Sequence, residues 1–101
     1  MSEFTPWLGL RHIRQGTDDS IGAKPTLAAV WADSTEGFER EIHVYTNAHG
    51  QQMIWTEQAM PADEWLTRHP ARMDAQRLAG KVSGKHPLAL VFPRHTVLRS
   101  A

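Results

Sequence analysis

The sequence predicts a small single-domain protein, 1–101, of the α+β class, in which an antiparallel sheet packs one face against two short helices. Apolar and polar residues alternate through 38–58 on both sides of a turn sequence, which is typical of a β-hairpin. The apolar run 26–32 predicts a strand beside this hairpin, and after Met60 the apolar period becomes helical. The expected elements are a meander of strands at about 26–32, 38–46 and 51–58, helices at about 61–69 and 71–82, and a further strand at about 88–92.

The hairpin is expected to turn at 47–50, because Gly50 suits the left-handed conformation that ends such a loop. A four-residue loop pairs Ile42 with Trp55 and keeps apolar pairs on one face. A three-residue loop instead places Glu41 opposite Glu57, which are like charges. Because cross-strand pairs contribute roughly 0.2–1 kcal/mol each, we expect the four-residue loop.

The two helices are predicted from prolines and from charge. Pro61 followed by Asp63 and Glu64 suits a first helical turn, and Pro70 disfavours helical geometry in the residue before it. The second helix is expected to end near Gly84. Its apolar residues recur at helical spacing and are expected to face the sheet: Ala71, Ala75, Leu78, Ala79 and Val82.

Three other segments are less regular. Residues 15–25 are expected to form a loop, because Gly, Asp and Ser are frequent there. Residues 7–13 are compatible with either a helix that starts at Thr5 or a strand. Residues 96–101 either extend the sheet or form a frayed tail.

Composition excludes several classes of protein. The chain has no cysteine, which rules out disulfides, thiolate nucleophiles and cysteine-ligated metals. Its first residues lack a basic region followed by an apolar run, and no stretch approaches the roughly 20 apolar residues of a membrane span. We therefore expect a cytoplasmic protein that does not contact membranes.

The charges are unevenly distributed along the chain. Residues 1–60 carry eight acids and four bases, whereas residues 61–101 carry three acids and seven bases. A basic helix can contact phosphates, so a nucleic-acid-binding accessory protein is one alternative. The residues that would make the contacts are Arg68, Arg72, Arg77, Lys81 and Lys85. A solvated helix face accounts for the same pattern and is the favoured interpretation.

Six histidines suggest a second alternative, a small metal- or histidine-dependent enzyme. No two of them have the i, i+4 spacing of a metalloprotease helix. Glu41 and His43 share a strand face, but a metal site needs a further ligand. His12 with Asp18 or Asp19 forms a general base only if the loop folds back. No catalytic residue, metal site or cofactor is therefore predicted.

The favoured function is a non-enzymatic binding or accessory module, of the inhibitor, immunity or regulatory type found in bacteria. It is expected to engage a protein partner, or a second copy in a homodimer, through the outer face and edge of the 38–58 hairpin. Trp65 on the first helix is a further candidate anchor, although a core position is the favoured interpretation because aromatic residues at helical spacing usually pack inward. The predicted partner-binding residues are Glu39, Glu41, His43, Tyr45, Ile54 and Trp65.

Overall fold

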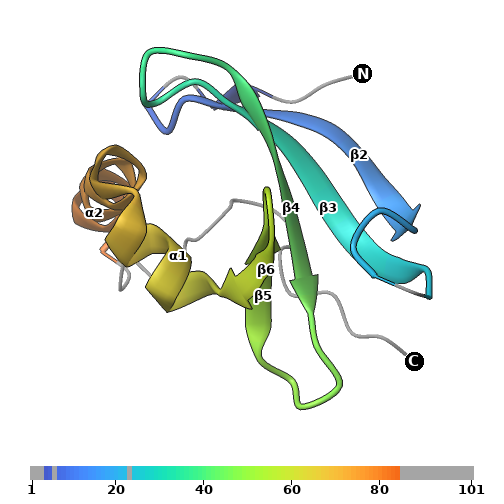
Figure 1. Ribbon diagram of the computed structural model, residues 1–101. Coiled ribbons are helices and arrows are strands. Elements are labelled where there is room, and N and C mark those ends of the chain that lie inside the picture. Colours follow the sequence, from blue (N-terminus) through green and yellow to red (C-terminus); the bar gives the residue numbers. More distant parts are fainter. Residues whose placement is uncertain (1–3, 6, 23, 85–101) are drawn as a thin grey trace.

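The computed structural model describes residues 4–5, 7–22 and 24–84 and shows an antiparallel sheet followed by two helices (Figure 1). Within the described residues the sheet has six strands whose spatial order follows the chain order, so it is a meander. This confirms the predicted α+β class. The elements are β1 Phe4–Thr5, β2 Leu10–Asp18, β3 Thr26–Asp33, β4 Arg40–Thr46, β5 Gln52–Trp55, β6 Ala59–Pro61, α1 Ala62–Arg68 and α2 Pro70–Ser83. The strand predicted at 88–92 and the tail 96–101 lie outside the described residues.

The main core lies between the curved sheet and the two helices, which cover one of its faces (Figure 1). Trp31 and Ile42 on the sheet and Trp65 and Leu66 on α1 have no exposed surface. Burial of such large apolar side chains stabilises each of them by roughly 1.5–3 kcal/mol, so this cluster holds α1 on the sheet. Neither helix in the described part of the chain has a long enough apolar run to cross a membrane.

The strand β2 extends into the segment that was predicted to be a loop. It pairs with β3 as far as Asp18, which lies opposite Thr26, and its register shifts between His12 and Arg14. The predicted loop 15–25 is therefore wrong for its first four residues. Pairing with a neighbouring strand outweighs the local turn preference of these residues.

The hairpin formed by β4 and β5 has the register of the three-residue loop, so the predicted four-residue loop is wrong. His43 lies opposite Trp55, one position from the predicted alignment. Like charges at Glu41 and Glu57 were the reason for rejecting this register, but β5 ends at Trp55 and Glu57 follows in a turn. The predicted strand 51–58 is in fact β5, this turn and the start of β6.

The hydrogen bonds of the turn explain why the shorter loop forms. The Asn47 backbone N–H donates to the Gln51 carbonyl at 2.9 Å, and the Gly50 N–H donates to the Asn47 carbonyl at 3.0 Å. The Asn47 side-chain oxygen accepts two further bonds, from the N–H groups of His49 and Gln51. Gly50 is left-handed with φ 80°, as expected for a type I turn followed by a bulge.

The new register changes which residues are buried. Ile54 lies opposite Val44 and belongs to the core, with no exposed surface. Trp55 and Met53 instead share the other sheet face with His43 and Tyr45.

The helix α2 ends as predicted, with Gly84 in the left-handed conformation and its N–H bonded to the Gly80 carbonyl. Its buried face differs from the predicted one. Leu78 and Val82 are exposed, whereas the buried residues are Arg72, Gln76, Ala79 and Gly80. The long polar side chains of Arg72 and Gln76 are therefore buried on α2, where the apolar pattern predicted Leu78 and Val82.

Candidate functional site

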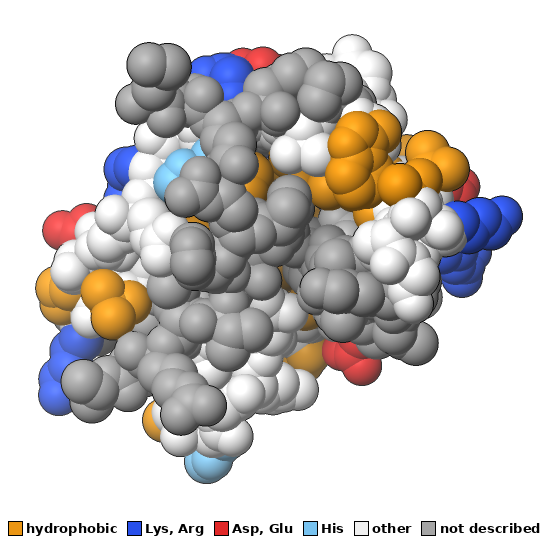
Figure 2. Space-filling view, turned by 180° about the vertical axis from the view of Figure 1, so that it is seen from behind, with side chains coloured by type: hydrophobic (Ala, Val, Ile, Leu, Met, Phe, Trp, Pro, Cys, Tyr) orange, Lys and Arg blue, Asp and Glu red, His pale blue; other side chains and the backbone are white. Residues whose placement is uncertain are grey.

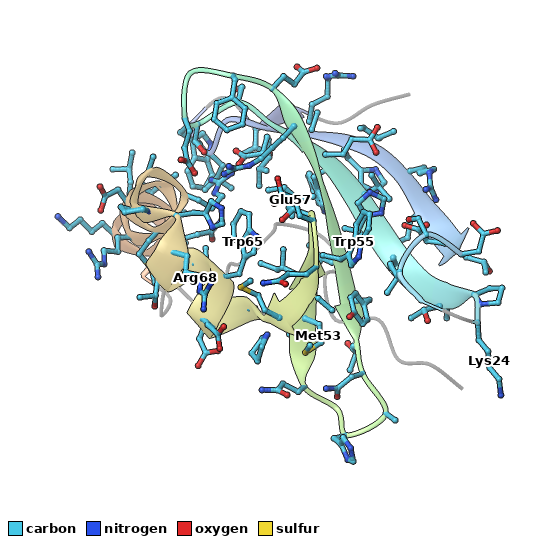
Figure 3. The ribbon with its side chains drawn as sticks, viewed as in Figure 1. Lys24, Met53, Trp55, Glu57, Trp65 and Arg68 are labelled. Carbon is cyan, nitrogen blue, oxygen red and sulfur yellow. The ribbon has the colours of Figure 1, made fainter. Side chains whose placement is uncertain are left out.

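A cavity of about 810 Å³ is bordered by the β3–β4 loop, β4, the β5–β6 turn and α1. Figure 3 shows Trp65 and Arg68 on the α1 side and Trp55 and Glu57 on the sheet side. The lining combines aromatic, acidic and basic side chains: Glu36, Phe38, Arg40, Glu41, His43, Trp55, Thr56, Glu57, Gln58, Met60, Trp65, Arg68 and His69.

The guanidinium of Arg40 forms part of the cavity wall. It donates to Asp33 Oδ2 at 3.2 and 2.9 Å and to Glu36 Oε1 at 2.6 Å. It also lies 5.2 Å from the ring centroid of Phe38 and 5.0 Å from that of Trp65. These distances permit cation–π attraction on both rings. Arg40 is therefore fixed by two carboxylates and two aromatic rings.

A second arginine, Arg72, joins α2 to the same carboxylate from the inside of the protein. Its Nη1 donates to Asp33 Oδ1 at 3.0 Å, its Nη2 donates to the Leu8 carbonyl, and the residue has no exposed surface. Burial lowers the pKa of Arg72 to about 10, although the charge of Asp33 opposes this shift. The prediction that Arg72 lies on a solvated basic face is wrong, because the side chain holds a buried ion pair.

The end of β2 is connected to the middle of β4 through Asp18 and His43. The Nδ1 atom of His43 makes a short contact with Asp18 Oδ2, and both side chains are almost completely buried. The other carboxylate oxygen accepts bonds from the N–H of Ser20 at 3.0 Å and from its hydroxyl at 2.6 Å. Burial raises the pKa of Asp18, but the bonds from Ser20 and His43 more than offset this and lower it to about 2. Asp18 is thus an ionised acceptor.

The opposite edge of the His43 ring faces the cavity. Its Nε2 lies 3.4 Å from Glu41 Oε1, and the ring meets Trp55 edge-to-face with centroids 5.0 Å apart. Because Asp18 accepts the Nδ1 proton, the neutral ring keeps its lone pair on Nε2. His43 can therefore offer the cavity an acceptor, or a charged donor when it is protonated.

On α1, a second histidine borders the cavity. The His69 ring stacks on Trp65 with centroids 3.9 Å apart and donates from Nδ1 to the Trp65 carbonyl at 2.7 Å. The indole N–H of Trp65 donates to the Thr56 hydroxyl at 3.2 Å. This wall is therefore held by hydrogen bonds to backbone and side chain.

The structure divides the predicted partner-binding residues into different environments. Glu39 and Glu41 are exposed, whereas His43 and Tyr45 on the same face are buried. Ile54 lies in the core, so its predicted place on the outer face is wrong. Trp65 also lies in the core, which was the favoured interpretation of this residue, and not in an exposed anchor position. These six residues do not form one exposed patch.

The predicted edge of the hairpin is also wrong. The strand β6 pairs with β5 through Ile54 and Met60, so β5 lies inside the sheet.

The basic residues predicted to bind nucleic acid also lie in different environments. Arg68 is exposed and pairs with Glu64 at 3.3 Å, and Arg77 pairs with Asp74 at 3.6 Å. Lys81 is exposed, and Lys85 lies outside the described residues.

The histidine that faces Asp18 is His43 and not His12, whose ring meets Trp31 at 4.9 Å between centroids. Sequence reasoning missed this pair because residues 15–18 were assigned to a loop, which left Asp18 without a strand position. Within the described ranges, no group of three or more potential ligands is placed to hold a metal ion.

Large exposed apolar side chains lie mostly apart from one another. Phe38, at 55% exposure, is on the rim of the cavity, whereas Leu78 and Val82 are on α2. On the face shown in Figure 2, hydrophobic side chains gather in separate places near the periphery. The cavity with its aromatic rim is therefore the strongest candidate site. Comparison with known proteins finds no matching family model, no significant match among curated proteins and no significant match among solved structures.

Proposed function

We propose that this chain is a non-enzymatic binding module that engages a protein partner at the cavity beside α1. The observation that carries the proposal is the combination of a cavity of about 810 Å³ with an exposed Phe38 on its rim and a half-buried Trp55 in its wall. Aromatic side chains in concave sites supply much of the binding energy of protein interfaces. A partner side chain inserted between them would lose contact with water.

The polar residues around these rings support the same function. Glu41 and Glu57 border the cavity on the sheet side, and Arg68 borders it on α1. A polar rim around aromatic contacts is typical of interfaces between proteins that also exist separately. Charges of both signs would align a partner in one orientation.

Binding is favoured over catalysis because no described residue places a nucleophile beside His43 on the side of the cavity. Ser20 bonds to Asp18, on the Nδ1 side of His43, and not on the side that faces the cavity. Of the described residues that line the cavity, Thr56 has the only aliphatic hydroxyl, and this group accepts a hydrogen bond from Trp65. A nucleophile next to its base is the usual requirement of covalent catalysis.

The proposal is tested by recovering partners from a lysate of the native host with the immobilised chain. The double variant Phe38→Ala and Glu41→Lys changes two exposed positions of the cavity. It is expected to recover at least tenfold less of the partner than the wild type. The control Leu78→Ala and Lys81→Glu changes two exposed positions of α2 and should retain it. Circular dichroism should show native folding for both variants.

Two results would contradict the proposal. Equal recovery with both double variants would exclude the cavity as the interface. Recovery that is abolished by nuclease treatment, and that weakens steeply with salt, would favour nucleic acid as the ligand instead.

A further inference from the structure

We infer that the cavity receives the guanidinium group of an arginine side chain from the partner, an assignment that rests on the proposed binding function. Two carboxylates and one aromatic ring on the sheet side of the cavity carry it: Glu41, Glu57 and the indole of Trp55.

The first observation is that these acceptors are available. Among the described residues, none forms an ion pair or hydrogen bond with the carboxylate of Glu57, and the carboxylate of Glu41 forms an ion pair only with His43, at 3.4 Å. The His43 side chain is itself held by Asp18 at Nδ1 and lies beside Glu41 at Nε2. Both carboxylates can therefore accept hydrogen bonds from a ligand.

The second observation is the charge that remains once existing pairs are counted. Arg40 is held by Asp33 and Glu36, and Arg68 is paired with Glu64. Among the described residues, the carboxylate of Glu57 has no cationic partner, and that of Glu41 has only His43. The cavity therefore attracts a positive group.

The third observation is a guanidinium already bound in the same wall. Arg40 lies over the rings of Phe38 and Trp65 while donating to two carboxylates. Trp55, Glu41 and Glu57 line the same cavity and offer a second set of the same groups. A planar group with five donors suits several acceptors around an aromatic face better than an ammonium does.

The experiment uses the full chain, ¹⁵N-labelled, titrated with N-acetyl-L-arginine amide at low salt. We expect a millimolar dissociation constant with shifts centred on the Trp55 indole N–H and the Gln58 amide. The neutral isostere N-acetyl-L-citrulline amide should bind at least tenfold more weakly. Glu57→Gln and Glu41→Gln should each weaken binding at least fivefold.

The controls separate this site from general charge attraction. Asp74→Asn removes one exposed carboxylate from α2 and should leave the affinity unchanged. The inference would be overturned if citrulline amide bound equally well, if N-acetyl-L-lysine amide bound more tightly than the arginine probe, or if shifts spread over all acidic residues. A partner that depends on Phe38 but is not displaced by the arginine probe would overturn the inference while leaving the proposed function intact.

Discussion

At the scale of single residues, the most informative positions are polar groups that the fold buries. Asp18 and His43 are separated by 25 positions in the chain, and Asp33 and Arg72 by 39. Neither pair has a local sequence pattern, because each exists only when two distant segments come together. For this reason the sequence indicated that His43 and Arg72 were candidates for surface functions, and it could not indicate their partners.

The lowered pKa of Asp18 predicts a pH-dependent contribution to stability. Its pKa falls from the ordinary 3.8 to about 2 on folding, so the ionised carboxylate stabilises the protein above pH 4. This contribution, about 2 kcal/mol, is lost as the pH falls from 4 to 2. Asp18→Asn should therefore lower the free energy of unfolding at pH 7, with a difference from wild type that narrows toward pH 2. Urea titrations at several pH values measure this difference in the free energy of unfolding.

The neighbouring Asp19 provides the control for this prediction. It is exposed, so Asp19→Asn should change stability by less than about 0.5 kcal/mol at any of these pH values. A constant difference between Asp18→Asn and wild type across the pH range would show that the carboxylate's charge does not matter.

Removal of the buried arginine should be much more damaging than removal of an exposed one. Arg72→Met takes one partner from a buried ion pair and frees the Leu8 carbonyl, so we expect a loss of about 3–5 kcal/mol. Arg77→Met, one and a half turns further along α2, removes an exposed side chain and should cost less than about 0.5 kcal/mol. Chemical denaturation of both variants measures the difference, and similar losses would contradict the buried role of Arg72.

At the scale of elements, prediction was reliable where the pattern is local and periodic. The hairpin 38–58, the strand 26–32 and the two helices all follow from alternation, prolines and glycines within short windows. The one-residue error in register came from giving weight to pairs beyond Trp55, where the strand has already ended. Where β5 ends depends on its pairing with β6, and that information is not local.

The turn of the β4–β5 hairpin allows a test of backbone conformation alone. Gly50 has φ 80°, and an added Cβ would meet no atom within 4 Å. Gly50→Ala should therefore cost about 1 kcal/mol, all of it from the left-handed backbone. Gly22 is equally open but has no positive φ, so Gly22→Ala should be neutral or stabilise by up to about 1 kcal/mol. Thermal unfolding compares the two, and an equal loss would refute the conformational explanation.

At the scale of the whole molecule, charge balance determines how copies of the chain interact in solution. Eleven acids balance eleven bases, and six histidines add positive charge as the pH falls. Self-repulsion is therefore smallest near neutral pH and should increase toward pH 5.5. Static light scattering at low salt should show a second virial coefficient that rises from pH 7 to pH 5.5. A coefficient that falls over this range would show that attractive contacts dominate.

The short strand β6 has a consequence for how the sheet ends. Edge strands with unpaired backbone N–H and C=O groups are templates to which strands of other molecules can add, and long, flat edge strands promote aggregation. Among the described strands, the edge strand on this side is β6, which has only three residues. Its last residue, Pro61, has no N–H, and α1 begins at the next residue. A strand from another molecule could form few backbone hydrogen bonds with β6, so fibril growth from this edge of the sheet is disfavoured.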